Sequence, residues 1–89
     1  MKKEDILKTA ETLITGQRAD DYGSLEDNFG RIAGMWSILL GRPEISKTDV
    51  ALCMAAVKMC RLYNSPDHID SWIDLAGYAA IGGELASDD

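Results

Sequence analysis

The chain has 89 residues and a formal net charge of −6 at pH 7, because 15 Asp and Glu residues outnumber 9 Lys and Arg residues. Hydrophobic residues make up 46%, aromatic residues 7%, and there are two prolines, a composition that favours packed helices over a sheet. The acidic balance leaves no positive field for the phosphates of DNA or RNA, so we expect no nucleic acid polymer as a partner. A small nucleotide remains compatible with this charge, since one or two cations and a helix N-terminus can hold it.

The length of the chain and its two cysteines indicate its oligomeric state and its cellular compartment. A chain of this size buries only about 60–65% of its unfolded surface, so we expect one domain over residues 1–89 that forms a homo-oligomer. Cys53 and Cys60 are about 10 Å apart along a predicted helix, too far for a disulfide between them. They are predicted to be small buried apolar residues in a reducing compartment. The chain has no long apolar run, and so we expect a cytoplasmic protein without a membrane partner.

The first predicted helix covers residues 3–15 and is amphipathic. Its apolar residues recur at helical spacing on one face: Ile6, Leu7, Ala10, Leu13 and Ile14. Gly16 marks the C-terminal end of this helix. We assign the helix to packing or to subunit contact.

Residues 16–24 are too polar and too rich in turn formers to continue the helix. Arg18 and Tyr22 stand out in this segment, because an arginine and a tyrosine beside a turn can grip and stack on a nucleotide. An arginine on a loop is more often simply solvated. Both interpretations of Arg18 and Tyr22 stay open on this segment alone.

A second helix is predicted over residues 25–40, with Ser24 as its N-cap. The expected buried face consists of Leu25, Phe29, Ile32, Ala33, Trp36, Leu39 and Leu40. Gly30 and Gly34 lie four residues apart, and each costs a helix about 1 kcal/mol relative to alanine, so we expect the backbone of another helix to approach closely there. Asn28 lies on the polar side, where it can cap, pair or bind.

The third helix is predicted over residues 47–63, opened by a variant of the capping box in Ser46 and Asp49. Its apolar residues go nearly all the way round, which indicates a central helix. The chain then turns at residues 64–65 and enters a fourth helix.

The fourth helix is predicted to have Ser65 as N-cap and Pro66 as its first helical residue, and to reach about residue 85. His68, in its first turn, is expected to be solvated. Residues 84–89 form an acidic tail. These elements predict an all-α protein with a compact four-helix arrangement and a central antiparallel helical hairpin.

Five charged residues interrupt this otherwise apolar hairpin: Lys58, Arg61, Asp67, Asp70 and Asp74. A turn centred on residues 64–65 predicts two groups, Arg61 beside Asp67 and His68, and Lys58 beside Asp70 and Ser71. One interpretation is a set of ion pairs at the edge of a bundle, where pairing offsets lost solvation. The other is a polar pocket for a phosphate or a metal ion.

Several short patterns together resemble a family of small phage and prophage proteins of unknown function. They are Arg18-xxx-Tyr22-Gly23, Asn28-Phe29, Trp36, Asp49-Val50, Lys58-xx-Arg61 and Asp70-xxx-Asp74-xx-Gly77-Tyr78. The resemblance covers nearly the whole chain. It implies a phage-encoded protein acting in the host cytosol.

More distantly, the last helix is similar to the helix that bears metal ligands in all-α MazG-type nucleoside triphosphate pyrophosphohydrolases. That resemblance implies a helical oligomer that uses Mg²⁺ to hydrolyse nucleotides. MazG-type sites need a glutamate-rich motif, whereas the third helix here offers Lys58 and Arg61 at that place. Asp70 and Asp74, with Glu26 or Asp27, are the candidate Mg²⁺ ligands under this alternative.

Three functions follow from these patterns. The first is a binding module without catalytic residues or a cofactor that holds a nucleotide and sequesters it, as a phage would sequester a host immune signal. Its expected roles are phosphate contact by Arg18, Lys58 and Arg61, base stacking by Tyr22 and Trp36, and recognition of polar edges by Asn28 and Asp70. The second is the Mg²⁺-dependent MazG-like enzyme. The third is a protein-interaction module whose internal charges are only ion pairs.

Overall fold

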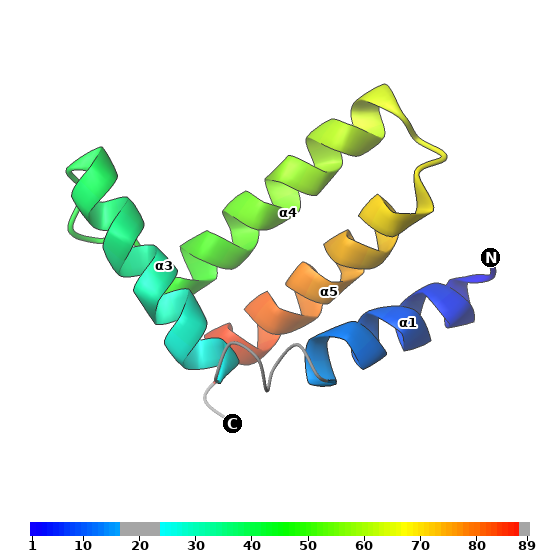
Figure 1. Ribbon diagram of the computed structural model, residues 1–89, viewed down its shortest axis with the longest axis horizontal. Helices are drawn as coiled ribbons and strands as arrows, with labels where there is room; N and C mark the ends of the chain where they lie inside the picture. The colour runs from blue at the N-terminus through cyan, green and yellow to red at the C-terminus, as the bar shows by residue number, and fades with distance from the viewer. Residues whose placement is uncertain (17–23, 88–89) are drawn as a thin grey trace.

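A computed structural model describes residues 1–16 and 24–87, and these ranges contain helices and no strand. The helices are α1 (Lys3–Thr15), α3 (Leu25–Leu40), α4 (Lys47–Asn64) and α5 (Ile69–Ala86) (Figure 1). The all-α prediction is confirmed. The bounds expected for the first three helices agree with the structure to within a residue.

The N-caps predicted for the second and third helices are formed. The Ser24 hydroxyl accepts a hydrogen bond from the backbone N–H of Asp27, at 3.1 Å. Ser46 and Asp49 form a reciprocal capping box, with distances of 3.1 Å to the Ser46 hydroxyl and 2.9 Å to the Asp49 carboxylate. Such a box satisfies backbone donors that the first turn of a helix leaves free, and so it fixes where α4 begins.

The predicted start of the fourth helix is wrong by about one turn. The helix begins at Ile69 with His68 as N-cap, and Pro66 belongs to a connecting turn. Two hydrogen bonds hold that turn: His68 donates its backbone N–H to the Ser65 carbonyl at 3.0 Å, and Trp72 donates its indole N–H to the Pro66 carbonyl at 2.9 Å. The serine and proline that were predicted to begin the helix therefore belong to a turn, which the indole of the following helix stabilises through the Pro66 carbonyl.

The hairpin of α4 and α5 is the centre of the fold (Figure 1). α1 packs along α5, and α3 crosses the end of the hairpin where α4 begins. Glycines allow two of these close contacts, since a Cβ on Gly77 would lie 3.2 Å from Ile14 of α1 and one on Gly82 would lie 3.2 Å from Ala51 of α4. In contrast, nothing described lies within 4 Å of a Cβ built on Gly34, and Gly30 meets only the Lys47 side chain. The helix backbone expected beside that glycine pair is not found among the described residues.

The buried core is small. Its hydrophobic members are Ala10, Phe29, Ala33, Val50, Ala51, Leu62, Ile73 and Ile81. The radius of gyration is 13.7 Å, against about 12 Å for a compact chain of this length, because the C-terminal end of α3 stands away from the other helices (Figure 1). Leu39 and Leu40 at that end are exposed, so their predicted burial is wrong.

The outer face of α4, away from α5, is also exposed. Cys53 and Cys60 lie on it and are free and exposed, which corrects the expectation that both are buried. Their neighbours Leu52 and Tyr63 are 68% and 94% exposed. The apolar residues of α4 do run all the way round, but the described residues of this chain cover only one side of the helix.

Candidate functional site

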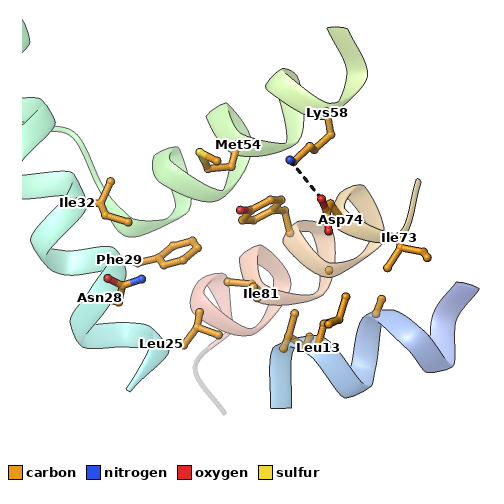
Figure 2. A pocket seen from close by; sticks show the side chains of 14 residues that line it. Leu13, Leu25, Asn28, Phe29, Ile32, Met54, Lys58, Ile73, Asp74 and Ile81 are labelled. Atoms are coloured by element: carbon orange, nitrogen blue, oxygen red, sulfur yellow. Dashed lines mark ion pairs between the residues drawn. The ribbon is translucent and has the colours of Figure 1, made fainter. Parts of the chain in front are cut away.

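A half-open cavity of about 300 Å³ lies where the helices α1, α3, α4 and α5 meet. Every described helix contributes to its wall (Figure 2). The lining residues are Ala10, Leu13 and Ile14 of α1, Leu25, Asn28, Phe29 and Ile32 of α3, Met54 and Lys58 of α4, and Ile73, Asp74, Gly77, Tyr78 and Ile81 of α5. A void of this size falls at the lower end of the range found for small-molecule sites.

Most of the cavity wall is apolar. Figure 2 shows Phe29 of α3 reaching towards α5, with Met54 of α4 on one side and Ile81 of α5 on another. Phe29 and Ile81 are buried, so packing holds them in place. An aromatic ring, a thioether and branched aliphatic chains together suit a flat, weakly polar group such as a nucleobase.

The polar end of the cavity is formed by an ion pair between α4 and α5. The Lys58 ammonium lies 3.2 Å from the Asp74 carboxylate, and the two side chains are 13% and 31% exposed (Figure 2). Removing an ammonium from water costs several kcal/mol unless a partner offsets it, which is what Asp74 does. The pair places a fixed cation and a fixed carboxylate beside an apolar void.

This pairing differs from the predicted one by one helical turn. The sequence placed Lys58 beside Asp70 and Ser71, whereas the structure pairs it with Asp74. The shift has the same cause as the late start of α5: the connection occupies residues 65–68, so the hairpin centre moves towards Pro66. Every cross-helix pair therefore moves about one turn along α5.

The predicted neighbours of Arg61 are also apart from it. Arg61 is exposed, and no ion pair joins it to Asp67 or to another residue of the described ranges. His68 is exposed as expected, and its Nδ1 lies 2.7 Å from the hydroxyl of Ser71. Ser71 is only 1% exposed, so the histidine satisfies a buried hydroxyl at the start of α5.

The other candidate residues separate into three groups. Asn28 and Lys58 line the cavity. Trp36, Arg61 and Asp70 do not: Trp36 packs half-buried against the core, and the other two are exposed. Arg18 and Tyr22 lie outside the described residues.

Among the lining residues that were not singled out from the sequence as ligand contacts, Tyr78 and Met54 lie next to the charged pair in helical spacing. Tyr78 follows Asp74 by four residues on α5, and Met54 precedes Lys58 by four on α4. Residues four apart share one face of a helix. That spacing from the charged pair is the signal that would have found both.

The candidate Mg²⁺ ligands are not assembled in the described part of the chain. No group of three His, Cys, Asp or Glu residues there is placed to hold a metal ion. Asp74 is paired with Lys58, and Glu26 is paired with Lys47 at 3.0 Å. Within the same ranges, no helix combines the length and the apolar character that crossing a bilayer requires.

Comparison with known proteins shows a family. A profile described as a domain of unknown function, DUF6378, matches residues 5–86. The Gene 55 proteins of Mycobacterium phages L5 and D29 are 42% and 43% identical to this chain over 76 residues, which is 85% of it. The chain spans about half the length of these curated relatives, with 49% and 50% of them covered. No solved structure matches. The helical chain described here therefore belongs to the DUF6378 family, a family that includes phage proteins.

Proposed function

We propose that this protein binds a small nucleotide or nucleotide-derived signal in the cavity between its helices and sequesters it without turnover. The observation that carries the proposal is the Lys58 side chain, 13% exposed, whose ammonium lies at the polar end of an otherwise apolar void. A base needs an apolar, flat-walled space, and a phosphate needs a cation held at a fixed distance from that space. Phage relatives make an intercepted host signal a sensible ligand.

Each lining group has a role in this proposal. The base occupies the space beside Phe29 and Met54, and the Asn28 amide, which has both donors and an acceptor, recognises its polar edge. A volume of about 300 Å³ holds a base with its sugar, so the phosphates lie at the rim. Lys58 reaches them without leaving Asp74, because an ammonium has three N–H donors.

Binding without turnover fits the arrangement of carboxylates. A MazG-like reaction needs several carboxylate oxygens around one Mg²⁺ ion. Asp74 is engaged by Lys58, and Asp70 is exposed outside the cavity. The Lys58 ammonium competes with Mg²⁺ for the Asp74 carboxylate, and its other N–H donors can bind a phosphate.

The test is a thermal-shift screen of the purified protein against nucleoside triphosphates, diphosphates, cyclic nucleotides and ADP-ribose-type nucleotides, with and without Mg²⁺. A ligand at about 100 times its Kd adds about 2.7 kcal/mol, enough to raise the Tm of a small domain by many degrees. We expect such a shift without Mg²⁺, with the ligand intact on chromatography. A Mg²⁺-dependent shift that releases monophosphate and pyrophosphate would identify a MazG-like enzyme. No shift with any of these nucleotides would leave a protein-interaction module as the function.

Matched variants locate the binding. Lys58→Met removes the cation from the cavity, and we expect it to abolish the ligand-induced shift. Lys47→Met is the control, because it also breaks an ion pair between helices, with Glu26, but lies outside the cavity. Asn28→Leu keeps a similar volume, removes the amide and is expected to weaken binding. If Lys58→Met and Lys47→Met retain the shift equally, the ligand is bound elsewhere.

A further inference from the structure

The exposed side of α4 carries a continuous row of uncharged residues. We call it the α4 strip: Leu52, Cys53, Ala56, Met59, Cys60 and Tyr63. Their spacing of i, i+1, i+4, i+7, i+8 and i+11 follows one face of a helix over three turns. All of them are exposed, and no Asp, Glu, Lys or Arg lies among them. This pattern is typical of a helix that packs against another helix.

A second exposed apolar group lies on the end of α3 that stands away from the rest of the molecule (Figure 1). We call it the α3 tip: Met35, Ile38, Leu39 and Leu40, which are 56% to 77% exposed. The tip and the strip belong to consecutive helices that diverge from a shared end (Figure 1). A partner that lies along α4 can therefore reach both.

The exposed area indicates the size of the partner. The free energy gained by fully burying a large apolar side chain corresponds, at the usual value per unit area, to about 60–120 Å² of apolar surface. The seven large side chains of the strip and the tip thus expose on the order of 500 Å² of apolar surface, near the largest patch found on ordinary monomers. Two copies joined through this face therefore bury on the order of 1,000 Å² of apolar surface in total, which is about the minimum for a specific interface. A folded partner of about this size fits better than a short peptide.

The lack of charge on this face allows a second copy of the chain to be that partner. The chain has a net charge of −6, so two copies repel each other over most of their surface. The α4 strip and the α3 tip contain no Asp, Glu, Lys or Arg, so two copies can pack through them without placing like charges in contact. We propose that the α4 strip, with the α3 tip beside it, is the interface of a homodimer with two-fold symmetry.

The position of α3 sets the direction of pairing. α3 stands at the N-terminal end of α4 (Figure 1). With parallel α4 helices the two copies of α3 would lie at the same end, whereas antiparallel helices place each α3 tip beside the C-terminal half of the other α4. Tyr63, which is 94% exposed, is at that half. The dimer is therefore antiparallel, and its formation does not depend on the nucleotide site proposed above.

The cysteines report on this geometry. In an antiparallel pair centred on the strip, Cys53 of one subunit lies close to Cys60 of the partner subunit. The two positions differ by about two residues, or about 3 Å along the helix axis. Helices that pack together are about 8–10 Å apart. A bis-maleimide with a span of about 10 Å is therefore expected to join the two subunits through these thiols.

The experiment is sedimentation equilibrium of the full chain from about 1 to 100 μM, with three proteins compared. We expect the wild type to dimerise, Met59→Glu to raise the dimer Kd about tenfold or more, and Leu7→Glu to leave it unchanged. Leu7 is the matched control because it is an exposed apolar residue, at 64% against 53% for Met59, on a helix outside the strip, α1. Circular dichroism of each variant confirms that its helices are folded.

Either of two results overturns the proposal. One is a monomeric wild type throughout this range, without a covalent dimer on bis-maleimide treatment. The other is a dimer that Leu7→Glu weakens as much as Met59→Glu does. If Met59→Glu does not fold, the cross-link decides alone: the dimer band is expected in the wild type and is expected to be lost in Cys53→Ser and in Cys60→Ser.

Discussion

The ion pair of Lys58 and Asp74 gives a quantitative prediction, because its two partners differ in exposure. Asp74→Asn leaves the Lys58 side chain, which is 13% exposed, without its carboxylate partner, and we expect a loss of about 2 kcal/mol in the free energy of unfolding. Lys58→Met leaves Asp74, 31% exposed, which can take up water in place of the ammonium, so the loss is about 1 kcal/mol. Replacing the lysine is thus expected to cost less than replacing the aspartate.

A double-mutant cycle measures the pair itself. We expect the double variant Lys58→Met, Asp74→Asn to lose less free energy of unfolding than the sum of the losses of the two single variants. The difference, which is the coupling energy of the pair, is expected to be about 1–2 kcal/mol. The matched cycle on Lys47 and Glu26, whose side chains are 40% and 70% exposed, is expected to give less than about 1 kcal/mol.

The assay is urea unfolding followed by circular dichroism, at one protein concentration for all variants because association raises apparent stability. Equal coupling in the two cycles would refute the reasoning, since it would mean that the Lys58 ammonium is no more desolvated than the Lys47 ammonium. A larger loss for Lys58→Met than for Asp74→Asn would refute the argument from exposure.

Two further predictions concern helix positions. Gly34→Ala is expected to raise the free energy of unfolding by up to about 1 kcal/mol in urea melts, because nothing described lies within 4 Å of the new Cβ, whereas Gly77→Ala is expected to gain less or to lose, because its Cβ meets Ile14 at 3.2 Å. An equal gain at both glycines would contradict this. Hydrogen bonds from the backbone N–H of Ser46, and then from its side chain, hold the pKa of Asp49 below its ordinary value of 3.8. The stabilisation that the ionised Asp49 carboxylate gives the folded state is therefore complete above pH 3.8, and it is lost as the pH falls through the lower pKa of the folded state. The Tm difference between the wild type and Asp49→Asn should therefore be constant near neutral pH and shrink in acid, and a difference that grows in acid would have the wrong sign.

Local signals predicted the helices well, and long-range register poorly. Ser24 and the Ser46–Asp49 box begin α3 and α4 through hydrogen bonds within one turn, so the sequence contains all that determines them. The turn before α5 includes a hydrogen bond from Trp72 back to Pro66, a contact that helix propensity does not encode. That single error displaced the predicted pairing of Lys58 by one turn. A cross-helix site is therefore harder to predict than the helices that form it.

Burial on α4 shows a second reason. An apolar face in a sequence indicates that something covers it, and does not say whether the same chain does so. Cys53 and Cys60 were expected to be buried on that ground, and the described residues leave them exposed. Leu39 and Leu40 of α3 were misplaced for the same reason.

The composition of α4 makes sense once its two sides are considered separately. The side that faces the cavity carries the charge of Lys58, and the side that faces away carries the uncharged α4 strip, which is the reverse of an ordinary surface helix. A charge turned inwards is tolerated where a carboxylate meets it beside a cavity, and apolar residues turned outwards are tolerated where a second copy covers them. On the two proposals made here, α4 holds the ligand with one face and the partner subunit with the other. Its apolar residues therefore go all the way round because both faces are to be covered, although only one is covered within the chain.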